Sequence, residues 1–184
     1  IATALTNIEK VIIKEKPEAF LVLGDTNSAL TAIVAKKYRI PIFHMEAGNR
    51  CFDERVPEEI NRKIVDHIAD INLPYSDIAR EYLIREGIHP KSIIKTGSPM
   101  YEVIQHNLEK IKSSSVLEKL SIEPNGYFLV SSHREENVDD IKKLSDFTDV
   151  LNELVEEYNI SILFSAHPRT LDRIKKFNLR LKDS

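Results

Sequence analysis

Carboxylate side chains directly follow two of the apolar segments that are expected to form buried β-strands. Asp25 comes just after the run 19–23, and Glu46 comes just after the run 40–44. In an open parallel sheet, ligands bind beyond the carboxyl ends of the strands, so both side chains are expected at the ligand-binding edge. Carboxylates that share such a site favour different protonation states, so that one can accept a proton while another donates one. The pattern predicts acid–base chemistry.

Glu58 is a third candidate, but its position has a competing structural explanation. It lies in the first turn of a helix expected to begin at Pro57, where the helix dipole favours negative charge. Arg62, four residues later, would form an ion pair with it worth about 0.2–0.5 kcal/mol. Asp25 has a similar alternative, because Asp after a strand often caps the next helix. Glu46 precedes an Ala-Gly pair rather than a helix, which makes it the best candidate of the three.

Basic side chains follow the expected strands of the second half in the same way. His133 and Arg134 come after the run 127–130, and His167 comes after the run 160–165. Arginine forms strong, often bidentate hydrogen bonds with phosphate. A lone His at a strand end is more often structural, but the three side chains together predict contacts to a phosphate or another leaving group.

Helices and strands are expected to alternate along the chain, since apolar residues recur at helical spacing between short unbroken apolar runs. The expected strands are residues 19–23, 40–44, 71–73, 92–95, 127–130 and 160–165. The expected helices are residues 1–15, 28–38, 57–69, 76–86, 100–111, 139–158 and a basic segment after Pro168. Such alternation is typical of open parallel sheets with right-handed crossovers.

A change in composition at residues 112–126 predicts a linker, because this segment contains a Ser-Ser-Ser run and ends in a Pro-Asn-Gly turn. We expect residues 1–111 to form an N-terminal Rossmann-like domain that lacks its first strands. Residues 127–184 would begin a second, C-terminal Rossmann-like domain. The predicted fold class is α/β, with two doubly wound parallel sheets that face a cleft and are incomplete at both ends.

The charge and composition exclude several classes of partner. The net charge of −3 provides no field that would attract nucleic acid or an anionic membrane. No apolar run approaches the roughly 20 residues of a membrane span, and no signal peptide is visible. The single Cys51 rules out an intramolecular disulfide and is typical of a reducing compartment, so we expect a cytoplasmic location.

Metal and dinucleotide binding are not expected. The six His residues include no His-x-x-x-His pair, and a single Cys excludes a thiolate site. The sequence also contains neither Gly-x-x-x-x-Gly-Lys-Ser/Thr nor Gly-x-Gly-x-x-Gly, so a nucleotide would be bound by other means. We expect neither a metal nor another cofactor.

Five short motifs resemble those of the non-hydrolysing UDP-N-acetylglucosamine 2-epimerases. They are Gly24-Asp25-Thr26, His44-Met45-Glu46-Ala47-Gly48, Pro57-Glu58-Glu59-Ile60-Asn61-Arg62, Thr96-Gly97-Ser98 and His133-Arg134-Glu135-Glu136-Asn137. Each motif alone is weakly specific, but they occur in the order found in the family and cover nearly the whole chain.

The resemblance implies a glycosyltransferase-B-like fold that holds UDP in its cleft, with residues 127–184 in the UDP-binding domain. It implies an isomerase that inverts C2 of a UDP-N-acetylhexosamine by eliminating and re-adding UDP, for capsule or O-antigen synthesis, without a cofactor. By motif, Asp25, Glu46 and Glu58 become the acid–base carboxylates. Arg62 becomes a partner of the phosphates or of the carboxylates, and His133 a contact to UDP. A homodimer is implied for the full-length protein.

Two departures from the family pattern carry information. Where the family usually has Leu-Arg after Glu-Ala-Gly, this chain has Asn49-Arg50-Cys51-Phe52-Asp53, a variant similar to the subgroup that forms UDP-N-acetyl-L-fucosamine from its C2 epimer. The family's Gly-Thr-Arg-Pro-like loop and its Asp-Ser-Gly-Gly segment do not occur here. We therefore expect a central fragment that is inactive by itself.

Two other functions remain open from the residues alone. A glycosyltransferase of the same fold would need an acceptor and would keep the configuration at C2. A UDP-sugar-binding module would carry out no chemistry. Three carboxylates favour the epimerase, because binding an anionic UDP group alone would favour basic side chains.

Overall fold

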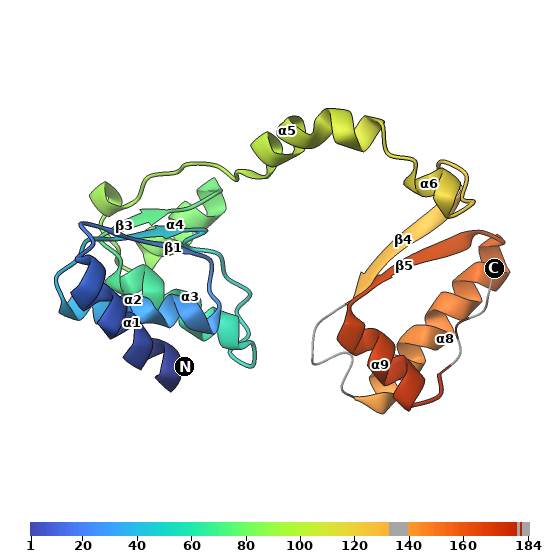
Figure 1. Cartoon of the computed structure of the whole chain (residues 1–184), viewed down its shortest axis with the longest axis horizontal. Helices are drawn as coiled ribbons and strands as arrows, with labels where there is room; N and C mark the ends of the chain where they lie inside the picture. Colours follow the sequence, from blue (N-terminus) through green and yellow to red (C-terminus); the bar gives the residue numbers. More distant parts are fainter. Residues whose placement is uncertain (133–139, 180, 182–184) are drawn as a thin grey trace. The chain divides into compact units, whose positions relative to one another are not determined.

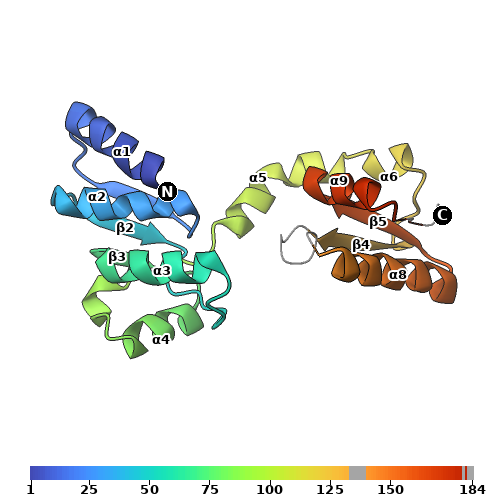
Figure 2. The ribbon, with the colours of Figure 1, turned by 90° about the horizontal axis from the view of Figure 1, so that it is seen from below.

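The structure, a computed structural model, describes residues 1–132, 140–179 and 181 of the chain. The chain divides into two compact units, Ile1–His106 and Asn107–Ser184, and each has its own parallel sheet (Figures 1 and 2). The prediction of a parallel α/β fold with two sheets is confirmed. None of the helices within the described residues is long and apolar enough to cross a membrane.

The first unit contains a three-stranded parallel sheet in the order β1 (Phe20–Leu23), β2 (Ile42–Met45) and β3 (Ile71–Leu73). Its strands are in register at their ends, with Leu23 beside Met45 and Met45 beside Leu73. The residues that follow each strand therefore emerge at one edge of the sheet. This edge is the one where the sequence predicts the site.

Three helices share a core with this sheet: α1 (Ala2–Glu15), α2 (Ala32–Lys37) and α3 (Pro57–Ile68). Figure 1 shows them gathered below the strands. The core consists of small and branched apolar side chains, which are Ile12, Val22, Ala29, Ala32, Ala35, Ile40, Ile42 and Val65. A short 3₁₀ helix, η1 (Asn27–Thr31), replaces the start of the single helix expected over residues 28–38.

The segment after β3 forms α4 (Asp77–Arg85), which begins where the Ser76 hydroxyl accepts a hydrogen bond from Ala79 N at 3.1 Å. Gly87 follows the helix with a φ of +90°, as a C-terminal glycine stop requires. The 3₁₀ helix η2 (Pro90–Ser92) comes next.

The strand expected over residues 92–95 is wrong. The chain there makes a single parallel bridge, between Asn72 and Ile93. Ile94 N still donates to Asn72 O at 2.9 Å, and Thr96 N donates to Pro74 O at 3.1 Å. Pro74 has no N–H to complete the ladder between these two bonds, so a regular strand does not form.

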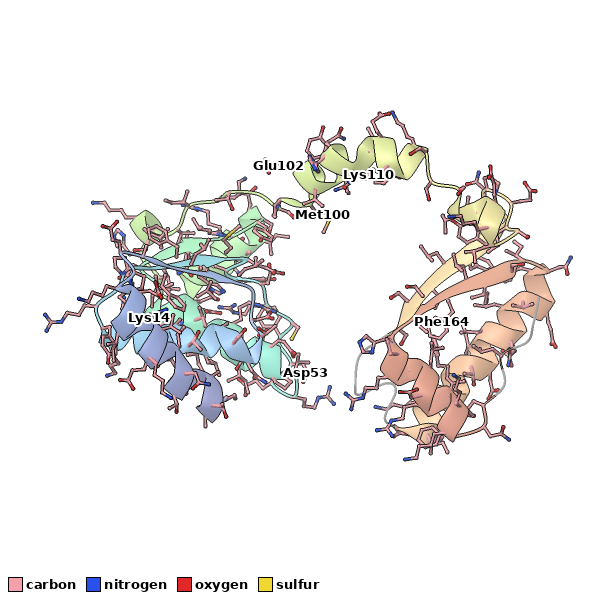
Figure 3. The ribbon with its side chains drawn as sticks, viewed as in Figure 1. Lys14, Asp53, Met100, Glu102, Lys110 and Phe164 are labelled. Atoms are coloured by element: carbon pink, nitrogen blue, oxygen red, sulfur yellow. The ribbon has the colours of Figure 1, made fainter. Side chains whose placement is uncertain are left out.

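The second unit pairs β4 (Tyr127–Ser132) with β5 (Ser161–Ala166) in parallel. It also contains α6 (Val116–Lys119), α8 (Ile141–Tyr158) and α9 (Pro168–Lys176), while α5 (Met100–Lys112) runs across the boundary between the units. Its small core combines Leu144 and Ile174 with aromatic rings. Phe164 of β5, labelled in Figure 3, packs edge-on against Phe147 of α8 with ring centroids 5.6 Å apart.

Candidate functional site

The ends of β1 and β2 bring the first two predicted carboxylates to neighbouring positions. Gly24 follows β1 with a φ of +73°, and its N–H donates to Met45 O at 3.1 Å. A Cβ atom at Gly24 would lie 3.4 Å from Oε2 of Glu46, so the Glu46 carboxylate sits directly over this glycine. Asp25 is the next residue. The prediction that these two strand ends meet at one edge is confirmed by the register of the strands.

Glu46 has an unusual backbone conformation for a residue with a side chain. Its φ is +66°, in the left-handed region, where an L-residue costs about 1–2 kcal/mol. The conformation is held by the Glu46 N–H, which donates to Leu73 O at 3.2 Å, and by Asn49 Nδ2, which donates to Glu46 Oε1 at 3.3 Å. Backbone strain of this kind is concentrated at functional sites, which supports Glu46 as a candidate.

Asp25 is anchored by helix α3 and does not cap the helix that follows it. Its carboxylate forms an ion pair with Arg62, and its carbonyl accepts a hydrogen bond from Asn61 Nδ2 at 2.9 Å. The following η1 starts after Thr26 without any side-chain cap. The capping explanation for Asp25 is therefore wrong, and its carboxylate lies at the sheet edge, paired with Arg62.

The expected ion pair between Glu58 and Arg62 is also wrong. The Arg62 side chain is only 13% exposed and points to the sheet edge, where it pairs with Asp25 and donates to Asn49 O at 2.9 Å. On α3 itself its carboxylate partner is Glu59, whose Oε2 lies 3.4 Å from Arg62 Nη1. Glu58 is exposed in the first helical turn, and its side chain has no hydrogen bond or ion pair with any other described residue. An acid–base role for Glu58 stays a prediction.

Of the two neighbouring acids Glu58 and Glu59, only Glu59 is buried, although its sequence context did not mark it as a candidate. It is fully buried, and its carboxylate accepts hydrogen bonds from Cys51 N at 3.0 Å and Phe52 N at 3.3 Å. Burial acts to raise the pKa of Glu59, but the hydrogen bonds from Cys51 and Phe52 and the charge of Lys63 outweigh it and lower the pKa below its usual value. Glu59 therefore fastens the loop that follows Glu46.

Replacing Glu59 with Gln should lower the free energy of unfolding at neutral pH by about 1.5–3 kcal/mol, because hydrogen bonds to a buried charged group are lost. Since the pKa of Glu59 is lower in the folded protein, its contribution is present at neutral pH. It disappears as the pH falls below the ordinary value of 4.5 and through the folded pKa. The wild type should therefore lose more stability on acidification than the variant. Urea denaturation at neutral pH and at about pH 3.5 measures this.

The neighbouring Glu58→Gln is the matched control for that experiment. Glu58 has the same chemistry and lies in the same helical turn, but it is exposed, so its loss should cost no more than about 1 kcal/mol through the helix dipole. Equal costs for the two substitutions would contradict the role given to Glu59.

Tyr75 is another site residue that was missed. It follows β3 by two positions, so the strand-end rule that identified Asp25 and Glu46 also applies to it. Burial and the negative charge of Glu46 raise the pKa of Tyr75, which places its phenol within electrostatic range of that carboxylate. The sheet edge thus holds two carboxylates, a guanidinium and a phenol. Carboxylates can accept or donate a proton, a phenol can donate one, and a guanidinium stabilises nearby negative charge.

The basic residues predicted for the second unit are only partly described. His133 and Arg134 lie outside the described residues. His167 is exposed at the start of α9, where its Nδ1 accepts a hydrogen bond from Arg169 N at 3.2 Å. This bond is the structural role of a helix cap, and ligand contact by His167 stays a prediction. Within the part of the chain that the structure describes, no group of three His, Cys, Asp or Glu side chains is arranged to hold a metal ion.

Comparison with known proteins identifies the family. The model of the UDP-N-acetylglucosamine 2-epimerase family matches residues 1–183. The chain is 41% identical over 179 residues to the UDP-N-acetylglucosamine 2-epimerase of Methanocaldococcus jannaschii, covering 95% of this chain and 49% of that protein. It is 37% identical over 182 residues to the UDP-2,3-diacetamido-2,3-dideoxy-D-glucuronate 2-epimerase of Pseudomonas aeruginosa, covering 97% and 50%.

Solved structures agree with this result. The UDP-N-acetylglucosamine 2-epimerase of Rickettsia bellii matches with 50% identity and a TM-score of 0.83, over 95% of this chain and 47% of that one. The M. jannaschii enzyme in complex with UDP-GlcNAc and UDP matches with 40% identity and a TM-score of 0.84, over 97% and 50%. The chain spans about half the length of the curated relatives it matches. On the family match, the identities and the shared fold, this chain belongs to the UDP-N-acetylglucosamine 2-epimerase family.

Proposed function

We propose that the whole protein is a non-hydrolysing UDP-N-acetylhexosamine 2-epimerase that interconverts UDP-GlcNAc and UDP-ManNAc. Family membership supports this activity. The observation that carries it is the placement of Glu46 over Gly24, beside Asp25, at one edge of a parallel sheet. Two carboxylates at one ligand-binding edge suit a reaction that removes a proton from one face of a carbon and returns it to the other.

In the proposed reaction, a carboxylate base takes the proton from C2 of the sugar. The electron pair of the C2–H bond forms a C1–C2 double bond, the C1–O bond breaks, and UDP leaves with the electron pair of the C1–O bond. The intermediate is a 2-acetamidoglycal. A carboxylic acid then delivers a proton to the opposite face of C2, and a UDP oxygen re-forms the bond to C1. Atoms and charges balance without a metal or a redox cofactor.

The proposed roles follow from what each side chain contacts. Glu46 and Asp25 are the acid–base pair, and Glu58 is a third candidate of the same kind. Arg62 is already paired with Asp25, so we assign it to holding that carboxylate in place. We assign His133, Arg134 and His167 to contacts with UDP.

A proton-exchange experiment tests the proposal. The full-length protein is incubated with UDP-GlcNAc in deuterated water, and C2 is followed by NMR. Deuterium at C2, together with the appearance of the manno epimer, is the expected result. An unchanged and unlabelled UDP-GlcNAc would contradict the proposal for that sugar. Transfer of the sugar to an added acceptor, with the configuration at C2 kept, would instead indicate a glycosyltransferase.

Two further substrates belong in the same experiment. The loop of residues 49–53 suggests the C2 epimer of UDP-N-acetyl-L-fucosamine. The P. aeruginosa relative, named as acting on a diacetamido-glucuronate sugar, suggests a nucleotide sugar with that substitution. If deuterium enters one of these sugars and not UDP-GlcNAc, the proposed reaction is supported but the proposed substrate is wrong.

We further propose that the full-length protein acts in the cytoplasm as a homodimer, supplying sugars for capsule or O-antigen. The single Cys51 supports a reducing compartment. Light scattering of the full-length protein tests the dimer, and a monomeric mass at micromolar concentration would contradict it.

A further inference from the structure

Asp66 is a buried carboxylate of α3 for which the proposed chemistry has no direct use. Its side chain has no exposed surface. The backbone N–H of Gly48 donates to both of its oxygens at 3.2 Å. Arg50 Nη1 lies 2.8 Å from Oδ2, and His44 Nδ1 lies 2.8 Å from Oδ1 without the alignment of a hydrogen bond. The side chains of Arg50 and His44 are buried as well.

These partners lie on both sides of Glu46 along the chain. His44 precedes Glu46 by two residues, and Gly48 follows it by two. Asp66 therefore contacts the end of β2 before the candidate base and the loop immediately after it. The backbone at Glu46 can rotate only if the end of β2 or the loop at Gly48 moves. The contacts with Asp66 therefore restrict the direction in which the Glu46 side chain leaves the backbone.

His44 extends this connection to the other carboxylate. Its Nε2 lies 2.9 Å from the Gly24 carbonyl oxygen, and it is the donor because a carbonyl oxygen only accepts. Gly24 directly precedes Asp25. A single chain of contacts thus runs from Asp66 through His44 to the turn that carries Asp25.

Stability alone does not account for this arrangement. A buried ion pair is often no more stabilising than well-packed apolar side chains, because desolvation of the charges offsets their attraction. The second carboxylate on Arg50 is Glu86, whose Oε2 lies 2.6 Å from Nη2. Burial acts to lower the pKa of Arg50, but the hydrogen bonds to Glu86 and the charge of Asp66 raise it, so the guanidinium stays charged. Asp66 and its contacts instead flank a strained part of the backbone, because Glu46 between them has a left-handed conformation.

We propose that Asp66 is a positioning residue that holds Glu46, and through His44 the Asp25 turn, in the geometry needed for proton transfer at the sugar. This inference rests on the proposed epimerase activity for its kinetic consequence. Its structural content, which is the fixing of segment 44–49, does not depend on that activity.

The kinetic test uses Asp66→Asn in the full-length protein. Asparagine keeps the size and one acceptor oxygen for Gly48 but removes the charge that faces Arg50. Because a misplacement of about 1 Å at a reacting group costs up to about 10²-fold, we expect kcat to fall by about 10- to 100-fold. The dissociation constant for UDP should stay within about threefold of the wild-type value, since Asp66 is assigned to positioning the reacting carboxylates and not to binding UDP. Activity is expressed per UDP-binding site, which corrects for any unfolded protein.

Asp70→Asn is the matched control. Asp70 also accepts a hydrogen bond from a backbone N–H, that of Ile42 at 2.8 Å, and forms an ion pair, with Lys36 at 2.6 Å. It lies at the amino end of β2, away from the Glu46 loop. Its loss should cost stability but leave kcat within about twofold, because no reacting group moves.

Hydrogen–deuterium exchange provides a readout that does not require activity. In Asp66→Asn, backbone amides of segment 44–49 should exchange at least about tenfold faster, because the Gly48 N–H loses its charged acceptor. If Asp66→Asn does not fold, His44→Gln replaces it, since glutamine can still donate to Gly24 O but lacks a group facing Asp66. It should show faster exchange in the same segment and a lower kcat.

The outcomes separate the two proposals. Wild-type protein without C2 exchange contradicts the proposed function, while amide exchange still decides whether Asp66 holds the loop. An active wild type, together with kcat within twofold for the folded Asp66 or His44 variant, overturns the positioning role. So does a loss of activity that only parallels the loss of UDP-binding sites. Unchanged amide exchange in segment 44–49 overturns it as well.

Discussion

Replacing Glu46 with Gln in the full-length protein should slow deuterium exchange at C2 by about 10²–10⁴-fold, the contribution typical of a general acid or base. Glutamine preserves the size of the side chain and an acceptor oxygen for Asn49 Nδ2. The left-handed backbone at this position tolerates the amide as well as the acid, so the loop should keep its conformation. NMR of the UDP-sugar in deuterated water measures the rate, and calorimetry with UDP measures binding.

Binding is the part of the result that distinguishes a chemical role from a structural one. The affinity for UDP should change by less than about threefold, because Glu46 is assigned to the sugar and not to the nucleotide. Glu54→Gln is the control, since Glu54 lies in the same loop, is 78% exposed and contacts Lys63 at 3.4 Å. Exchange that survives in Glu46→Gln at the rate of this control would show that the acid–base assignment is wrong.

Replacing Gly48 with Ala should lower the free energy of unfolding by about 2–5 kcal/mol, from overpacking and a strained backbone together. A Cβ atom at Gly48 would lie 2.4 Å from Ala79 O and 2.8 Å from Leu83 Cγ, closer than any real contact. The φ of +78° adds the cost of a left-handed residue. Loop 46–49 packs directly against α4 here, and relief would require the helix to move.

Gly97→Ala separates the two contributions. Gly97 has the same φ of +78°, but a Cβ atom there would have no neighbour within 4 Å. Its replacement should therefore cost only the backbone part, about 1–2 kcal/mol. Both glycines belong to the first unit, so urea denaturation followed by a probe in that unit compares them directly. Similar costs for the two variants would rule out the close packing of Gly48 against α4.

The sequence alone predicts which strand ends place the candidate carboxylates at the ligand-binding edge. Short apolar runs followed by Asp25 and Glu46 identify buried parallel strands, and parallel strands end at a common edge whatever the details of packing. The family motifs were equally readable, because they are local strings of residues. The structure and the comparisons confirm the fold class and the family on that basis.

The partners of the charged residues on α3 could be read from the folded chain but not from the sequence. Helical spacing made Glu58 the natural partner of Arg62, but burial turned Arg62 toward Asp25. Glu59, Arg62 and Asp66 lie at i, i+3 and i+7, one face of a helix, and that spacing is the signal that could have identified Glu59 and Asp66. Sequence periodicity marks a face but not what lies against it.

The same reason explains why the strand expected over residues 92–95 does not form and why Tyr75 was missed. Pro74 blocks the ladder only because residues 94 and 96 lie opposite it, and Tyr75 belongs to the site only because β3 ends beside Glu46. Local propensity determines which segments become strands and helices. Partners distant in the sequence are determined by packing, because each buried charge or N–H must find a partner in the space that the folded chain leaves to it.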